Sequence, residues 1–118
     1  EPYVYIYRGM CYCDIAYDYT HALEDYDKAI AINPKIFEAQ CYRGVALSNL
    51  KQYAEAVSAF TKAIEIEATN AQAYYERGEC YYHLGKKKLA LADWEIAAAN
   101  PKYQELVRPK IQKLKSEK

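Results

Sequence analysis

Residues 42–63 read YRGVALSNLKQYAEAVSAFTKA, and three features of this stretch recur in the chain at a fixed distance. The glycines Gly44 and Gly78 are 34 residues apart. Small residues repeat at the same interval, and so do large aromatic residues; the two sets are Ala22, Ala56, Ala90 and Tyr26, Phe60, Trp94. Three kinds of position that keep one period of this length indicate an array of repeated supersecondary units.

Each unit has the composition of a helix pair. The chain holds only four Gly and four Pro in 118 residues, which leaves little turn material for a many-stranded β fold. Small residues such as Gly44 and Ala56 allow two helices to approach to about 8–10 Å, and the large aromatic residues would fill the space between one pair and the next. We expect helices over 3–15, 19–32, 36–50, 53–67, 71–84, 87–99 and 103–116.

The pattern resembles the tetratricopeptide repeat, whose signature is an aromatic residue, a small step ending in Gly, and later Ala-x-x-x-Phe and Pro. The resemblance covers about residues 2–101, and its departures are an extra residue within 13–20, Ala68 in place of Pro, and an early Pro101. It implies an all-α fold, a right-handed superhelical α-solenoid of three antiparallel helix hairpins plus a C-terminal capping helix. As a single array over 1–118, its parts would be repeats 2–36, 37–70 and 71–101, then a capping helix and Lys-rich tail over 102–118.

The capping segment carries an apolar stripe. We expect Leu106, Val107, Ile111 and Leu114 to seal the open end of the third repeat, as a solenoid requires. Pro109 lies inside the segment, so we expect either a kink there or a helix that begins at Pro109.

Arginines recur beside the repeated glycines. Arg8 and Arg77 each have an aspartate one residue before the aromatic of the following helix, Asp25 and Asp93, whereas the middle repeat has Ala59 there. We expect Arg8 to meet Asp25 and Arg77 to meet Asp93 across each hairpin, fixing one helix against the other. Recognition of a ligand phosphate or carboxylate by these arginines is the alternative.

Charge and composition exclude several classes of partner. The formal net charge is zero, and residues 1–85, which hold most of the tyrosines, carry a balance of −5, so nucleic acid is not expected. Residues 86–118 carry a balance of +5, either a Lys-rich capping end or a basic contact patch. There is no apolar run of about 18 residues that could span a membrane. The four cysteines form no C-x-x-C pair, which favours a reducing, cytoplasmic location.

Catalytic and metal-binding patterns are not found in the sequence. Glu79 and His83 share a helix face at i, i+4, but no third ligand is evident, so no metal site is expected. Cys80 occupies the same slot as Cys11 and Ala46, which indicates a small buried residue rather than a reactive thiol. Nucleotide-binding and nucleophile-elbow motifs are lacking, so we expect neither a cofactor nor an enzyme.

The resemblance implies that the first helix of every hairpin lines a concave groove that binds peptides or helices. Carried over position by position, the groove residues are Tyr3, Ile6, Met10, Cys13, Asp14, Glu38, Cys41, Val45, Ser48, Asn49, Gln72, Tyr75, Glu79, Tyr82 and His83. The spacing of Ile6, Met10 and Cys13 supports one helical stripe independently. Such an apolar and weakly acidic wall would suit a peptide with apolar and basic side chains.

One subclass of the family clamps the C-terminal carboxylate of cytosolic heat-shock chaperones with basic and amide side chains. The matching positions here are Ile6, Met10, Tyr42, Gln72 and Glu76, none of them basic. We therefore expect a scaffold or adaptor that binds a protein or peptide partner but is not a carboxylate clamp. The alternative is a structural or oligomerisation module whose groove is filled by its own chain or by a second copy.

Overall fold

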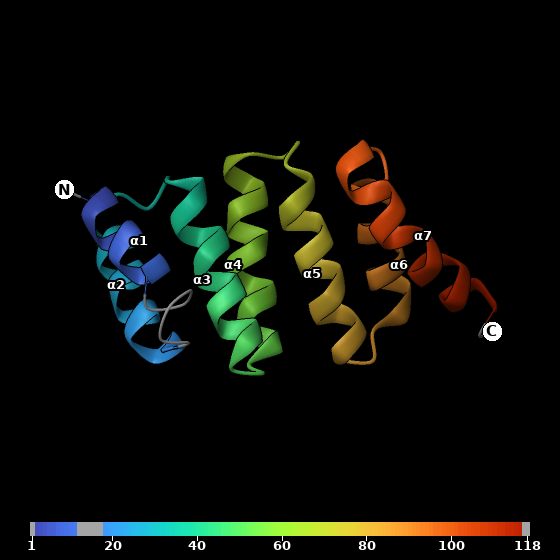
Figure 1. Ribbon diagram of the computed structural model, residues 1–118, viewed down its shortest axis with the longest axis horizontal. Helices are drawn as coiled ribbons and strands as arrows, with labels where there is room; N and C mark the ends of the chain where they lie inside the picture. The colour runs from blue at the N-terminus through green and yellow to red at the C-terminus, as the bar shows by residue number, and fades with distance from the viewer. Residues whose placement is uncertain (1, 12–17, 117–118) are drawn as a thin grey trace.

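The computed structural model describes residues 2–11 and 18–116, and in this part of the chain all regular structure is helical. The helices pack in consecutive antiparallel pairs along an elongated stack of 46 × 25 × 22 Å, with α1 and α7 at opposite ends (Figure 1). The bounds are α1 Pro2–Cys11, α2 Tyr19–Ile32, α3 Phe37–Asn49, α4 Tyr53–Ile66, α5 Ala71–His83, α6 Lys87–Ala97 and α7 Pro101–Ser116. The expected all-α solenoid is confirmed; the expected continuation of the first helix to residue 15 lies outside the described residues.

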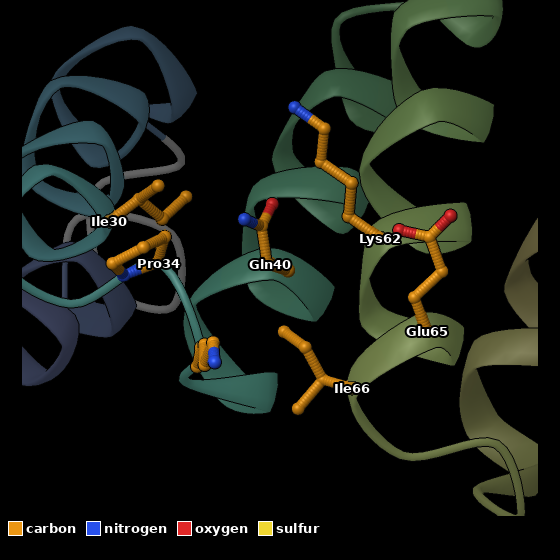
Figure 2. Close-up of a pocket in the computed structure, with 7 residues that line it drawn as sticks. Ile30, Pro34, Gln40, Lys62, Glu65 and Ile66 are labelled. Carbon is orange, nitrogen blue, oxygen red and sulfur yellow. The ribbon is translucent and has the colours of Figure 1, made fainter.

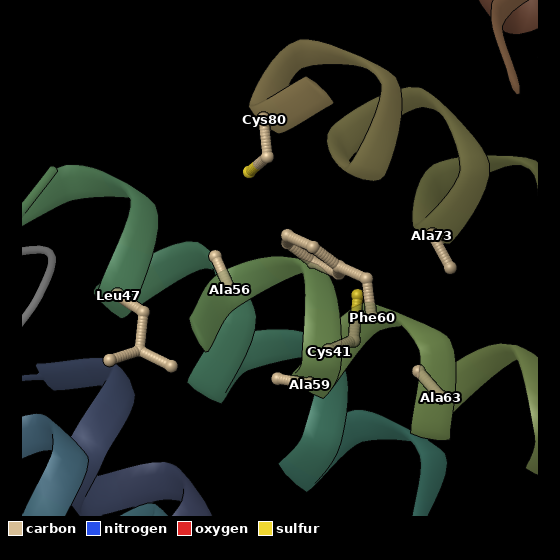
Figure 3. Packing of buried hydrophobic residues seen from close by; sticks show 8 residues of the cluster. All are labelled: Cys41, Leu47, Ala56, Ala59, Phe60, Ala63, Ala73 and Cys80. Carbon is tan, nitrogen blue, oxygen red and sulfur yellow. The ribbon is translucent and has the colours of Figure 1, made fainter. Parts of the chain in front are cut away.

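Each hairpin is held by a glycine beneath an aromatic ring. A Cβ placed on Gly44 would lie 2.7 Å from a ring carbon of Phe60, and the same separation holds for Gly78 and the Trp94 ring. Phe60 is fully buried among small side chains of α3, α4 and α5 (Figure 3). The repeated glycines are therefore required by close approach, as the spacing predicts.

Helix ends are set by short polar side chains. The Asp18 carboxylate accepts a hydrogen bond from the His21 backbone N–H at 3.1 Å, and Asn70 Oδ1 accepts one from the Gln72 N–H at 2.9 Å. Asn100 does the same for Lys102, at 2.9 Å, where α6 gives way to α7. These caps satisfy amides that have no partner within the helix.

The two expected arginine–aspartate pairs are present. Arg8 donates two hydrogen bonds to Asp25, at 2.9 and 2.7 Å, and Arg77 donates two to Asp93, both at 2.8 Å. Both aspartates are almost wholly buried. Each pair thus locks the first helix of a hairpin to the second with bidentate geometry.

The arginine of the middle hairpin pairs with a residue of another hairpin. With Ala59 in the place of an aspartate, the Arg43 guanidinium turns to Asp27 of the preceding hairpin, where Nε lies 2.7 Å from the carboxylate. Arg77 also reaches back, donating to Thr61 Oγ1 at 3.2 Å. Arginines at this position therefore join neighbouring hairpins as well as the helices within one.

The last helix differs from expectation in where it begins and in which residues it buries. α7 starts at Pro101, so Pro109 lies inside it and does not begin it. Val107 and Leu114 are buried and Ile111 is half-buried, but Leu106 is 46% exposed, so its expected place in the stripe is wrong. Tyr103, Val107 and Lys110 follow each other at four and three residues, so they share the inner face of the helix, and Leu106 lies off that face.

Candidate functional site

The first helices of the pairs lie side by side with α7, and we call the surface formed by α1, α3, α5 and α7 the first-helix face (Figure 1). The residues expected to line a groove differ in exposure. Tyr3, Glu38, Asn49 and His83 are exposed, and Met10, Val45, Ser48, Gln72, Tyr75, Glu79 and Tyr82 are half-buried. Cys13 and Asp14 lie outside the described residues.

Two of the expected groove residues are core residues instead. Ile6 is 2% exposed and packs with Ala22 and Tyr26, while Cys41 is 1% exposed and packs around Phe60 (Figure 3). Their side chains fill space between helices, so they support the face from beneath and do not offer it contact area. Burial first, and the nearby Glu76 and Glu38 charges second, raise the pKa of the Cys41 thiol to about 12.

Glu76 is the acidic centre of the first-helix face, although the expected groove residues did not include it. Burial, and then the charge of Glu79, raise the pKa of the half-buried Glu76 carboxyl to about 7. Its charge also helps to raise the pKa of Tyr103, after burial, so the carboxyl stands near both α3 and α7. No ion pair joins Glu76 to a basic side chain within residues 2–11 and 18–116.

Helix α7 covers the α5 end of the first-helix face. The ring of Tyr103 stacks on that of Tyr75 with centroids 5.4 Å apart, and Lys110 Nζ lies 3.2 Å from a carboxylate oxygen of Glu79. Lys110, one of the basic residues of 86–118, therefore pairs with an acidic residue of the third repeat.

Beside that contact lies a small cavity of about 280 Å³, lined by Glu79, Tyr82, His83, Trp94, Lys110 and Lys113. The imidazole of His83 stacks on the ring of Tyr53 from α4, with centroids 4.5 Å apart. Tyr82 packs against the Trp94 ring at 5.7 Å. These two expected groove residues thus take part in holding α5 against its neighbours.

Cys80 has the environment expected for a structural residue, whereas Cys11, at the same position of the first repeat, is exposed. Cys80 is 1% exposed, and burial raises its pKa to about 12, with the charge of Glu76 as a smaller cause. A thiol with such a pKa stays protonated and unreactive at neutral pH. Within the described residues, no three His, Cys, Asp or Glu side chains come together as a metal site, and no helix is both long and apolar enough to cross a membrane.

Comparison with protein families gives three matches to repeats of one kind. A family described as "Tetratricopeptide repeat" matches residues 25–58, another of the same description matches 72–102, and one described as "TPR repeat" matches 49–85. Together they span residues 25–102, which hold the later part of α2 and the two following hairpins.

Curated relatives match over part of their length. The chain is 33% identical over 98 residues to human serine/threonine-protein phosphatase 5, covering 76% of this chain and 20% of that protein. It is 34% identical over 98 residues to mouse protein unc-45 homolog B, covering 77% of this chain and 10% of that one. The chain therefore spans a fifth or less of these relatives.

Solved structures match over almost the whole chain. The Arabidopsis OM64 TPR domain superposes with a TM-score of 0.93 at 24% identity, covering 99% of this chain and 96% of that one. The first TPR of Spaghetti (RPAP3) bound to the HSP90 peptide SRMEEVD gives 0.91 at 24% identity, covering 98% and 90%. The Yersinia enterocolitica chaperone SycD with a YopD peptide gives 0.89 at 13% identity, covering 96% and 91%. With its 34-residue period, its glycine–aromatic hairpins and these matches, the chain belongs to the tetratricopeptide repeat family.

Proposed function

We propose that this domain is a protein-interaction module that binds a peptide segment along the first-helix face, and that the segment carries a basic side chain among apolar ones. The contact area would come from Tyr3, Met10, Val45 and Tyr82, with the Glu76 carboxylate as the charged anchor. Tyrosine and methionine offer broad, adaptable apolar contact.

The observation that carries the proposal is the half-buried carboxyl of Glu76, which forms no ion pair with a basic side chain in the part of the chain that the structure describes. Removing a carboxylate from water without a cation is unfavourable, and the pKa of about 7 reflects that cost. An arginine or lysine from a partner would offset it, because a charge-assisted hydrogen bond in a partly buried place is strong. Glu79 cannot serve equally, since Lys110 already binds it at 3.2 Å.

The same residue argues against a bound carboxylate. RPAP3 holds the HSP90 peptide SRMEEVD, and SycD holds a YopD peptide, so grooves of this architecture accept peptides. Here, however, no basic residue stands at Ile6, Met10, Tyr42, Gln72 or Glu76, and Glu76 itself would repel an acidic terminus. Peptides rich in acidic residues are therefore poor candidates.

A second candidate function rests on α7. The Tyr103 ring stacks on Tyr75, and Lys110 forms an ion pair with Glu79. These are the aromatic and basic contacts expected of a bound peptide, but α7 of the same chain makes them. In this alternative the domain is a structural or oligomerisation module whose groove is filled from within. The cytoplasmic location and the non-enzymatic role expected from the sequence stay predictions.

Selection from a phage library of random dodecamers would test the proposal. Peptides recovered on the domain should combine Lys or Arg with apolar residues. Synthetic versions should bind at least about tenfold more weakly to Glu76→Gln, the loss of one charge-assisted hydrogen bond. Glu55→Gln, an exposed carboxylate on α4, is the matched control.

Binding should also tighten between pH 6 and 8, as Glu76 ionises. Acidic peptides in the selection, or equal affinity of Glu76→Gln and Glu55→Gln, would contradict the proposal. Recovery of no peptide by the monomer, together with self-association in light scattering, would favour the structural alternative.

A further inference from the structure

Helix α1 leaves one of its faces uncovered at its end of the elongated molecule. Val4, Tyr7 and Cys11 lie three and four residues apart, so they form one stripe along the helix, which we call the α1 end stripe. Val4 is 58% exposed, Tyr7 is 61% exposed, and Cys11 is exposed as well. None of the three belongs to the peptide site proposed on the first-helix face. Neighbouring apolar residues on one exposed helix face indicate a contact surface.

The later hairpins show which contact this stripe makes. Relative to the repeated glycine, it occupies the fifth and second residues before and the second residue after. The equivalent residues are Ala39, Tyr42 and Ala46 in α3, and Ala73, Glu76 and Cys80 in α5. The outer two of each set are at most 1% exposed, and they are buried in clusters with the preceding hairpin, around Tyr26 for α3 and around Phe60 for α5. The face that α3 and α5 bury against the hairpin before them is therefore exposed in α1.

The contact of α2 with α3 shows in detail what covers such a stripe. The Tyr26 ring of α2 stacks on Tyr42 with centroids 6.1 Å apart. The next residue of α2, Asp27, accepts a hydrogen bond from Arg43 Nε at 2.7 Å. An aromatic–acidic pair on the covering helix thus meets a Tyr-Arg pair on the covered helix.

The two hairpins stand apart at the edge of this contact. Figure 2 shows Gln40 of α3 between Ile30 of α2 and Ile66 of α4, and these side chains line a pocket of about 590 Å³. Close contact between the hairpins therefore depends on the small residues of the stripe, Ala39 and Ala46, which are fully buried.

Helix α1 carries the same Tyr-Arg pair without a covering helix. Tyr7 and Arg8 stand where Tyr42 and Arg43 stand in α3. The Arg8 side chain is 51% exposed, against 27% for Arg43. Arg8 is also the one charged residue within 2–11, so the apolar stripe has a single positive charge beside it. An acidic helix is complementary to this surface, whereas a second copy of α1 would bring two arginines together.

We infer that the α1 end stripe binds an amphipathic helix of a partner protein, seated as α2 is seated on α3. The partner helix runs antiparallel to α1 and presents an aromatic residue to Tyr7, followed directly by Asp or Glu for Arg8. Val4 and Cys11 are larger than the alanines of α3, so the partner has small residues opposite them. Recognition of a helix through apolar anchors at helical spacing is a common mode of peptide binding.

A synthetic peptide with the chain's own α2 sequence, residues 19–33, is the probe. A lactam bridge between the side chains of Glu24 and Lys28, which are exposed and one helical turn apart, holds it helical without changing its contact face. It is titrated into the isotopically labelled 118-residue chain and followed by NMR. The Val4 methyl groups and the Tyr7 backbone amide should shift, with weak, saturable binding. Absence of shifts in α1 at millimolar peptide would overturn the inference.

Peptide variants test the aromatic–acidic pair. Asp27→Asn in the peptide should weaken binding about two- to fivefold, as expected for one exposed ion pair. Tyr26→Ala in the peptide should weaken it about five- to tenfold through the loss of the ring contact. Equal affinity of all three peptides would contradict the assigned chemistry of the partner.

Variants of the domain separate this stripe from general surface binding. Val4→Lys and Tyr7→Glu should each abolish peptide binding and leave cooperative melting intact, because both side chains are exposed. Leu106→Lys replaces an apolar residue of α7 that is 46% exposed, and it should bind the peptide as the natural chain does. Undiminished binding in Val4→Lys and Tyr7→Glu contradicts the site.

Disulfide exchange tests the direction of the bound helix. In a Cys13→Ser background, where Cys41 and Cys80 are buried, Cys11 is the thiol open to exchange. A peptide with an added N-terminal cysteine should couple to Cys11 much faster than one with an added C-terminal cysteine, because an antiparallel helix begins near Cys11. Equal rates would contradict the antiparallel seating.

Light scattering distinguishes a partner helix from a second copy. We expect the natural chain to stay monomeric as its concentration rises. Dimerisation that Val4→Lys abolishes would assign the stripe to a second copy and overturn the inference.

Discussion

Lys51 occupies the same place in its turn as Gly85 does 34 residues later, and both have left-handed backbones, with φ of 64° and 77°. Each follows the last residues of a first helix, and its N–H bonds back to a carbonyl three residues earlier, Ser48 for Lys51 and Tyr82 for Gly85. The later turn therefore has glycine, which adopts this conformation without strain. The earlier turn has Lys51, whose left-handed backbone lowers the stability of the fold.

Lys51→Gly should accordingly stabilise the domain. The left-handed conformation costs an L-residue about 1–2 kcal/mol, from which the greater chain entropy of glycine removes about 0.5–1 kcal/mol. We expect a gain of up to about 1 kcal/mol in the free energy of unfolding. Urea denaturation measures it, with Gly85→Ala as the opposite change, expected to destabilise. A loss of stability in Lys51→Gly would show that its side chain has a role not visible here.

Gly44→Ala should destabilise the middle hairpin. The added Cβ would lie 2.7 Å from the Phe60 ring, so the hairpin must open or the ring must move. Overpacking of this kind costs about 1–3 kcal/mol. A double-mutant cycle with Phe60→Leu checks the cause, because the smaller side chain should relieve part of the loss. Simple additivity of the two changes would place the strain elsewhere.

Asp93→Ala should cost more stability than Asp25→Ala. Both carboxylates are buried, but the arginine left behind differs: the Arg77 side chain is 18% exposed and that of Arg8 is 51% exposed. Arg8 can return to water, whereas Arg77 stays partly buried without its partner, a situation that costs up to about 3–5 kcal/mol. Thermal and urea unfolding of the two variants provide the comparison. Equal losses would mean that desolvation of the arginine is not the controlling factor.

Stability should fall as pH rises from about 5 to 7. The pKa of Glu76 is about 7 in the folded protein and 4.5 as its ordinary value, so the folded state binds more protons between these values. The contribution of Glu76 to the loss is complete once its carboxyl is ionised in the folded protein as well. His21, whose pKa is raised by Asp18, acts with the same sign, since its pairing is lost as the imidazole deprotonates.

Melting temperatures measured at pH 5, 6, 7 and 8 for the natural chain and for Glu76→Gln separate these two groups. The variant should lose most of the pH dependence in this window. An unchanged slope would assign it to His21 or to another group.

Much of the fold could be predicted because it depends on local spacing. The 34-residue period defines the helix pairs, and the place of Asp25 and Asp93 before their aromatics predicts both arginine pairs. The resemblance to the family also predicts which helices form one face. These features can be predicted without the packing angle between one hairpin and the next.

The site could be predicted only in part, because the burial of each side chain depends on how neighbouring hairpins pack. Ile6 and Cys41 have the right spacing for a groove, but their neighbours bury them. The sequence marks Glu76 only as a clamp position without a basic residue, and its burial cannot be predicted from the spacing of residues along one helix.

Helix α7 takes the place that the first helix of a fourth hairpin would occupy, contacting α6 and, through Tyr103 and Lys110, also α5. Its exposed residues are mainly polar, such as Gln104 and Arg108, with Leu106 as an apolar exception. Through Val107 and Leu114, α7 covers the apolar residues of α6 at this end of the array. Lengthening it by design would first require α7 to be replaced by a repeat with two apolar faces.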